Sequence, residues 1–167
     1  GLGDVYKRQT YIRRYLKDAP KCTTTSHHLS HSAYAYYTGP YKRAVILVID
    51  SIGEWDTVSI WTGDNGKLKK LWSQAYPDSI GIWYSAMTQR CGLKANAQEY
   101  LLSEYAIKGD RYAYLDAIEK DFTSQKMLKN GFWQVRFKEN LHRGCKSWRP
   151  DLTTEQDMYD IAAATQL

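Results

Sequence analysis

The sequence predicts an α/β domain in which a three-stranded meander precedes a set of helices. Three short segments with strand-like patterns, residues 43–50, 57–62 and 68–76, follow one another and are joined by short turns. After Pro77, apolar residues recur at helical spacing instead. Strands followed by helices are typical of α/β and α+β domains, and 167 residues suit one domain or part of a larger one.

The N-terminal region contains weaker signals. We interpret residues 1–9 (GLGDVYKRQ) as a non-native or disordered leader, because they lack periodicity and an initiating Met. Residues 10–17 predict a short helix, and residues 22–26 predict a strand or loop. Small and aromatic residues over 29–37 predict a second helix, which Gly39-Pro40 ends.

The strands are the clearest predicted elements. Residues 43–50 (RAVILVID) form a continuous apolar run, which predicts a strand buried on both faces and ending at Asp50. Gly53 then turns the chain, and residues 57–62 alternate. Asp64-Asn65-Gly66 predicts a tight hairpin turn before the third strand, so the three strands form an antiparallel meander.

The second half of the chain is predicted to be mainly helical. Apolar residues share a helical face in segments 79–92, 97–107 and 112–122, residues 132–137 alternate like a short strand, and residues 140–150 form a loop. Thr153 is the predicted N-cap of a final helix, with a capping box over residues 153–156. This pattern runs to Leu167 without a stop signal, so we expect an internal fragment of a longer protein.

Composition excludes several classes of protein. With 43% hydrophobic and 25% charged residues, the chain can bury a core, which excludes global disorder. No apolar run approaches the ~18 residues of a spanning helix, so no membrane partner is predicted. A net charge of +5 and a pI of about 9.0, without dense basic runs, favour small anionic substrates over nucleic acid.

Cysteine usage points to a cytoplasmic location. Cys22, Cys91 and Cys145 are odd in number and far apart, so they predict neither a disulfide framework nor a zinc motif. A reducing compartment fits this pattern best.

Histidines and an aspartate form a candidate metal site. His27 and His31 are four residues apart and would share a helical face, so both imidazoles can reach one divalent ion, whereas His28 points elsewhere and is interpreted as structural. Asp50 is the third candidate, because a buried carboxylate is costly unless it is paired or bound to metal. Such a site leaves coordination positions open, as catalysis requires. In the alternative interpretation, Asp50 caps the following turn through backbone amides.

The segment after Asp50 is a candidate substrate site. Ser51 supplies a hydroxyl group and Gly53 permits close approach, so the turn can cradle a phosphate; a plain β-turn is the alternative. Glu54 is a candidate acid or base, or else a solvated turn residue.

Aromatic residues cluster after the histidines. Tyr34, Tyr36 and Tyr37 are candidates for lining a pocket for a sugar-like or nucleoside acceptor, although ordinary packing explains most aromatic residues. Basic and aromatic content also allows a nucleic-acid-binding module, but no recognised module pattern supports it.

Three blocks, HHLSHSAYAYY, VIDSIGEW and YPDSIGIWYSAMTQRCGLKANAQEY, together resemble the N-terminal domain of the O-carbamoyltransferases. This family includes the nodulation-factor and antibiotic carbamoyltransferases. The resemblance covers residues 27–105, with a weaker similarity at YDIAAATQ. It implies an actin-like ATPase (ribonuclease H-like) fold, similar to the universal tRNA threonylcarbamoyl-transfer protein. Residues 10–167 would then be part of that domain.

The resemblance also implies a reaction. A carbamoyl-adenylate, made from carbamoyl phosphate and ATP, would give its carbamoyl group to an acceptor hydroxyl with the help of an iron-type divalent metal. The implied site residues are the metal ligands His27, His31 and Asp50, the substrate-binding residues Ser51, Gly53 and Glu54, and Glu54 as the catalytic residue. Expected partners are small molecules and the remainder of the full-length chain, and a homodimer is allowed.

The sequence departs from the family in ways that keep a rival hypothesis open. The family turn reads Asp-Gly-x-Gly-Glu, whereas Ser51 replaces the first glycine here, and the segment after Tyr100 (LLSEYAIKGD) also differs. The family's opening catalytic-histidine block, Gly-rich segment and adenylate-forming domain are absent from these residues, so we expect the fragment alone to be inactive. The rival is a non-catalytic binding or interaction domain that retains the fold.

Overall fold

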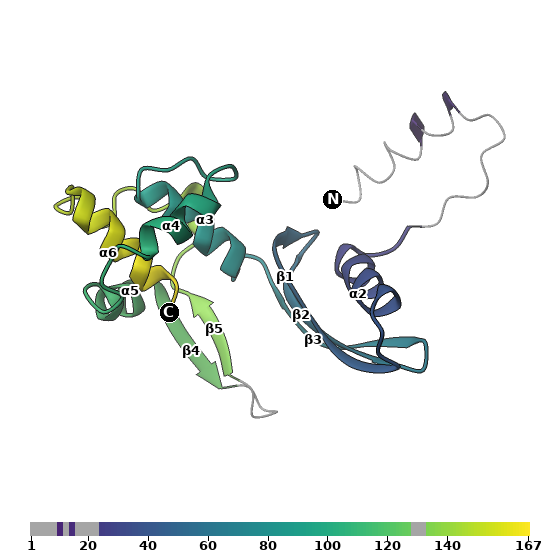
Figure 1. Cartoon of the computed structure of the whole chain (residues 1–167). Coiled ribbons are helices and arrows are strands. Elements are labelled where there is room, and N and C mark those ends of the chain that lie inside the picture. The colour runs from purple at the N-terminus through teal and green to yellow at the C-terminus, as the bar shows by residue number, and fades with distance from the viewer. Residues whose placement is uncertain (1–9, 12–13, 16–23, 128–132) are drawn as a thin grey trace. The chain divides into compact units, whose positions relative to one another are not determined.

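The computed structural model describes residues 10–11, 14–15, 24–127 and 133–167 (Figure 1). The chain forms two compact units, and the division between them falls within each of the first three strands. The first unit comprises residues up to Val48 together with Ser59–Trp72, and the second comprises Ile49–Val58 and Ser73–Leu167. The predicted leader, residues 1–9, lies outside the described residues.

The described elements confirm a mixed α/β chain. In order they are α2 (His27–Thr38), β1 (Arg43–Gly53), β2 (Asp56–Asp64), β3 (Lys67–Ala75), α3 (Ile80–Arg90), α4 (Glu99–Ala106), α5 (Leu115–Phe122), β4 (Thr123–Met127), β5 (Trp133–Phe137), the 3₁₀ helix η1 (Leu141–Arg143) and α6 (Glu155–Thr165). Residues 10–11 and 14–15 of the predicted first helix are helical. No helix within the described residues is both long enough and apolar enough to cross a membrane.

Helix α2 packs on the sheet through Tyr36, which is buried with Ile46, Val48 and Trp61. The Tyr36 hydroxyl donates to the carbonyl of Lys42 at 2.7 Å and accepts from a backbone amide at 3.1 Å. These contacts fix the rotation of the helix. The helix begins at His27, two residues earlier than predicted, and so includes the first histidine.

The predicted meander is confirmed, because β1, β2 and β3 are neighbours in that order. The β2–β3 connection consists of Asn65 and Gly66, with φ angles of 45° and 80°. Two consecutive residues with positive φ form the hairpin turn that matches the twist of the strands, which explains the choice of Asn-Gly.

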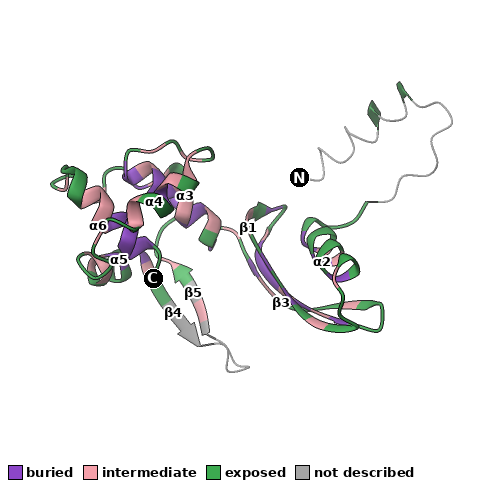
Figure 2. Cartoon of the chain, viewed as in Figure 1, coloured by how far each residue is buried: buried purple, intermediate pink, exposed green. Residues whose placement is uncertain are grey.

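The prediction that β1 is buried on both faces is wrong. Ile46 and Val48 are buried, whereas the alternate residues Val45 and Leu47 are 73% and 58% exposed. Figure 2 shows buried and exposed segments together in the sheet that contains β1. β1 therefore alternates like a half-buried strand at one edge of its sheet. The strand also continues beyond Asp50 to Gly53, so Asp50 lies within the strand rather than at its end.

The second unit has its own core, formed by α3, α4, α5 and α6, in which Met87, Leu102 and Ile161 are fully buried. Trp83 packs edge-on against Phe122, with ring centroids 5.2 Å apart. These contacts hold α3, whose N-terminal end adjoins the last residues of β1 in the same unit.

Two details of the second unit differ from the prediction. β4 was missed; it pairs antiparallel with β5, from Thr123 opposite Phe137 to Met127 opposite Trp133. The N-cap of α6 is Thr154 rather than Thr153, because the capping box is completed by the side chain of Asp157.

Candidate functional site

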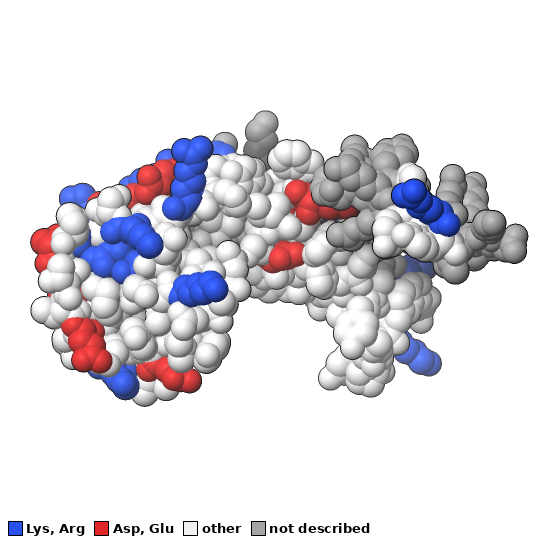
Figure 3. All heavy atoms as spheres, turned by 90° about the horizontal axis from the view of Figure 1, so that it is seen from above, with Lys and Arg blue, Asp and Glu red and all other residues white. Residues whose placement is uncertain are grey.

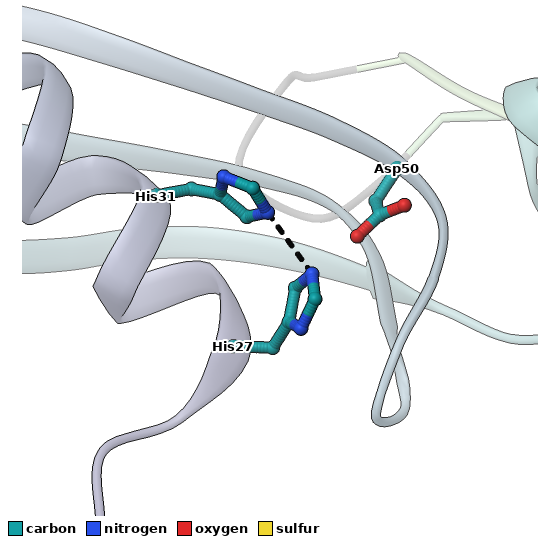
Figure 4. Close-up of side chains that lie close together, drawn as sticks. All are labelled: His27, His31 and Asp50. Atoms are coloured by element: carbon teal, nitrogen blue, oxygen red, sulfur yellow. Dashed lines mark hydrogen bonds between the residues drawn. The ribbon is translucent and has the colours of Figure 1, made fainter.

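The N-terminal end of α2 brings two imidazoles together. His27 and His31 are one helical turn apart, and their Nε2 atoms lie 3.0 Å apart. Both side chains are exposed, and the ring centroids are 4.7 Å apart in an edge-on arrangement. Two nitrogen donors thus point to one place on the surface of the helix (Figure 4).

Asp50 completes a group of three candidate ligands. One nitrogen of each imidazole and one carboxylate oxygen of Asp50 lie within 4.8 Å of one another (Figure 4). Ligand bonds of ~2.0–2.2 Å place neighbouring donors about 2.8–3.6 Å apart around a tetrahedral or octahedral ion. The 3.0 Å separation of the two nitrogens fits such an ion, and imidazole and carboxylate suit iron, zinc or manganese.

His28 has the structural role that its spacing predicted. It is 1% exposed, and its Nδ1 lies 2.6 Å from the hydroxyl oxygen of Ser59 on β2. The same oxygen accepts a hydrogen bond from the Trp61 indole at 2.7 Å. His28 thus anchors the helix that presents its two exposed neighbours.

The backbone around Asp50 is held by the N-terminus of α3. Ser79, the N-cap of α3, accepts from the amide of Ile82 and donates to the carbonyls of Asp50 and Ser51, at 3.2 Å and 2.7 Å. Gly81 permits this packing, because an added Cβ would lie 2.6 Å from the Ser51 hydroxyl oxygen. The Ser51 amide in turn donates to the Asp50 carboxylate at 2.7 Å.

The residues predicted to bind substrate occupy different environments. Ser51 lies in β1 and lines a cavity, and Gly53 is buried at the end of the strand. Glu54 is exposed in the turn that follows, with a φ of 65°. A non-glycine residue at positive φ is strained, and such strain is common at functional sites.

The cavity beside Ser51 has a volume of about 220 Å³. One face of α3 contributes Ile82, Ser85, Ala86 and Gln89, and η1 contributes His142 and Arg143. Sequence reasoning missed this cavity. The available signal was weak, since Ser85 and Gln89 interrupt an otherwise apolar helical face.

A carboxylate behind the cavity wall orients its polar groups. Glu99 accepts from the Ser85 hydroxyl at 2.9 Å and from the Asn96 amide at 2.5 Å. Burial raises the pKa of Glu99, but hydrogen bonds from backbone amides and from Ser85 lower it more, and the net pKa falls below its usual value. Glu99 is therefore ionised, and the Ser85 hydroxyl proton is engaged with it.

Of the three tyrosines predicted to line an acceptor pocket, two lie beside a pocket and one does not. Tyr36 and Tyr37 line a second pocket with Gly66, and the Tyr37 hydroxyl donates to the Gly66 carbonyl at 2.9 Å. Tyr34 is 75% exposed and does not line it.

Cysteine chemistry is disfavoured in the described part of the chain. Cys91 and Cys145 are free and buried, and burial raises the pKa of each thiol to about 12. A thiolate is the reactive and metal-binding form, so neither residue is poised for catalysis at neutral pH. Cys22 lies outside the described residues.

Charged side chains of both signs lie on the described surface of the second unit. On the face drawn in Figure 3, acidic and basic side chains are interspersed over the second unit.

Comparison with known proteins supplies the family. A model described as Carbamoyltransferase N-terminus matches residues 5–160. Nodulation protein NolNO of Sinorhizobium fredii is 26% identical over 152 residues, which are 89% of this chain and 22% of that protein. The uncharacterized protein sll1178 of Synechocystis sp. is 39% identical over 102 residues, 61% of this chain and 16% of that protein.

A third relative also matches this chain over a small part of its own length. The uncharacterized protein MJ1058 of Methanocaldococcus jannaschii is 27% identical over 113 residues, 59% of this chain and 18% of that protein. The chain thus spans about one fifth of the length of these curated relatives. Because the family model matches nearly the whole chain, the protein belongs to the carbamoyltransferase N-terminus family.

Proposed function

We propose that this chain supplies the metal-binding part of the active site of a carbamoyltransferase, which moves a carbamoyl group to an acceptor hydroxyl. The observation that supports it most is the grouping of His27, His31 and Asp50 in a member of this family. The three residues would hold a divalent metal, of iron type. When bound, that ion polarises the carbamoyl or phosphate oxygens as a Lewis acid.

The neighbouring residues have separate roles in this proposal. Ser51 and Gly53 contact the phosphate or carbamoyl end of a carbamoyl-adenylate, which is made from ATP and carbamoyl phosphate. The acceptor oxygen attacks the carbamoyl carbon, the bond from that carbon to the phosphate oxygen breaks, and AMP leaves. Glu54 takes the proton from the acceptor hydroxyl as a general base.

We also propose that the meander and helices are part of an actin-like ATPase (ribonuclease H-like) domain. The mixed α/β architecture, with three consecutive strands followed by helices, supports this assignment.

Transfer of an isotope-labelled carbamoyl group, measured in the full-length protein with ATP and carbamoyl phosphate, tests the proposed chemistry. We expect Glu54→Gln to lower turnover by about 10²–10⁴-fold, as removal of a general base does, while metal content stays unchanged. Glu104→Gln, an exposed residue on α4, is the matched control and should retain activity. Full activity in Glu54→Gln would remove Glu54 from the mechanism.

A further inference from the structure

A buried carboxylate between β3 and α3 has no part in the chemistry proposed above. Among the acidic residues that the structure describes, Asp78 alone is buried, with 5% of its surface exposed. A buried charge is costly, and replacement of a buried ion pair by apolar residues is often neutral or stabilising. The burial of Asp78 is therefore explained better by a role in fixing local geometry than by stability alone.

The side chain of Asp78 binds two donors of β5. Its carboxylate accepts hydrogen bonds from the Phe137 amide at 2.9 Å and from Nε of Arg136 at 3.1 Å. The Arg136 side chain is 49% exposed, so the ion pair lies at the edge of the core. The Phe137 ring stacks on Trp83 of α3, with ring centroids 5.7 Å apart. Asp78 is thus tied to a strand that packing already holds in place.

The backbone of Asp78 is fixed by two further buried donors. Its carbonyl accepts hydrogen bonds from the Thr57 hydroxyl of β2 at 2.5 Å and from the Gln74 side-chain amide of β3 at 2.9 Å. Thr57 is completely buried and Gln74 is 5% exposed, so water does not compete for these bonds. The orientation of the peptide that joins Asp78 to Ser79 is therefore set by both side-chain and main-chain contacts.

Ser79, the next residue, connects this orientation to the proposed metal ligand. Its buried hydroxyl lies 3.2 Å from the Asp50 carbonyl oxygen and 2.7 Å from the Ser51 carbonyl oxygen. The Ser51 amide in turn donates to the Asp50 carboxylate at 2.7 Å. Hydrogen bonds thus run without a break from β5 through Asp78 and Ser79 to the Asp50 segment, all within the second unit.

We infer that Asp78 is a positioning residue of the proposed metal centre, and that it sets the place of the Asp50 carboxylate through Ser79. A bound ion requires ligand distances within about 0.2 Å of their preferred values, so a small displacement of one ligand weakens binding. This inference rests on the proposed function for the metal. The hold of Asp78 on the Asp50 segment is independent of it.

The first test uses the 167-residue chain without metal and the NMR signal of the Ser51 amide, which reports its hydrogen bond to the Asp50 carboxylate. Asp78→Asn keeps the size of the side chain, but it removes the charge and places an amide donor against Arg136. We expect it to shift the Ser51 signal, whereas Asp116→Asn, an exposed residue of α5, should not. An unchanged Ser51 signal in folded Asp78→Asn would overturn the inference.

Variants of Arg136 provide the same test at a half-exposed position, where folding is less at risk. Arg136→Gln breaks the ion pair and should shift the Ser51 signal in the same direction as Asp78→Asn, by a smaller amount. Arg136→Lys keeps the charge and a donor, so it should restore most of the wild-type signal. Arg111→Gln, also exposed, is the matched control. If Asp78→Asn does not fold, an unchanged Ser51 signal in Arg136→Gln overturns the inference.

Metal affinity separates this inference from the metal proposal. In Zn²⁺ titrations of equally folded proteins, the dissociation constant of Asp78→Asn should exceed those of the wild type and Asp116→Asn by about 10–100-fold. A purely stabilising role would leave this constant unchanged, and equal affinities would overturn the inference while upholding the metal centre. A Ser51 shift in a chain that binds no metal would uphold the positioning of Asp50 and reject the metal centre.

Discussion

Replacing Ser79 by alanine tests how α3 holds the segment that contains Asp50 and Ser51. The Ser79 hydroxyl is completely buried; it caps α3 through the Ile82 amide and donates one proton to the carbonyls of β1. Loss of an N-cap costs about 1 kcal/mol, and loss of one hydrogen bond to a buried carbonyl costs about 1 kcal/mol more. We therefore expect Ser79→Ala to destabilise the second unit by about 2 kcal/mol.

Urea unfolding followed by far-UV circular dichroism measures this effect, because most described helices belong to the second unit. With a urea dependence of ~1–3 kcal/mol/M, the midpoint should fall by about 1 M. Exchange of the Ile82 amide with solvent should also accelerate. The matched control is Ser147→Ala, an exposed loop serine, which should leave the midpoint within about 0.3 M of the wild type. Equal midpoints for Ser79→Ala and Ser147→Ala would refute the role of Ser79.

Three further predictions concern the two cores and helix α6. Phe122→Ala should cost about 3–5 kcal/mol by denaturation, because the ring is 1% exposed and packs between two tryptophans; a loss below 1 kcal/mol would contradict that packing. Tyr36→Phe should cost about 1–2 kcal/mol through its two hydrogen bonds to the backbone, and an unchanged stability would show that they contribute nothing. Hydrogen bonds from Thr154 lower the pKa of Asp157 from 3.8 to about 2, so the α6 cap is fully stabilising above pH 3.8 and is lost as pH falls through about 2. Asp157→Asn should flatten this acid transition in circular dichroism, and an unaltered transition would assign it to other carboxyl groups.

Local sequence signals predicted much of the first unit. Asn65-Gly66 specifies its turn by backbone conformation alone, and the four-residue spacing of the histidines specifies their shared helical face. Neither property depends on distant parts of the chain, which is why both were predictable.

Two of the three failures share a physical cause, which is dependence on tertiary contacts, and the third is local. The apolar run 43–50 carries no alternation, so its sequence could not reveal that Val45 and Leu47 face solvent. The polar segment Thr123–Met127 becomes a strand because β5 pairs with it. The N-cap prediction was one residue early because two threonines are adjacent, and only the Asp157 side chain distinguishes them.

The candidate site was predictable only where it depends on local spacing along the chain. A helical spacing indicated His27 and His31, whereas the cavity requires α3 to meet Arg143, more than 50 residues further along the chain. Such a meeting is set by packing of the second core, which a local pattern does not record.

Metal stoichiometry of the 167-residue chain tests the proposed metal centre. The wild type, His31→Ala and His142→Ala would be loaded with Fe²⁺ or Zn²⁺, desalted and measured by atomic emission, with circular dichroism to show equal folding. We expect about one ion per wild-type and His142→Ala chain, and a loss of that ion in His31→Ala. Equal metal content in all three proteins, or no metal in the wild type, would contradict a metal centre at His27, His31 and Asp50.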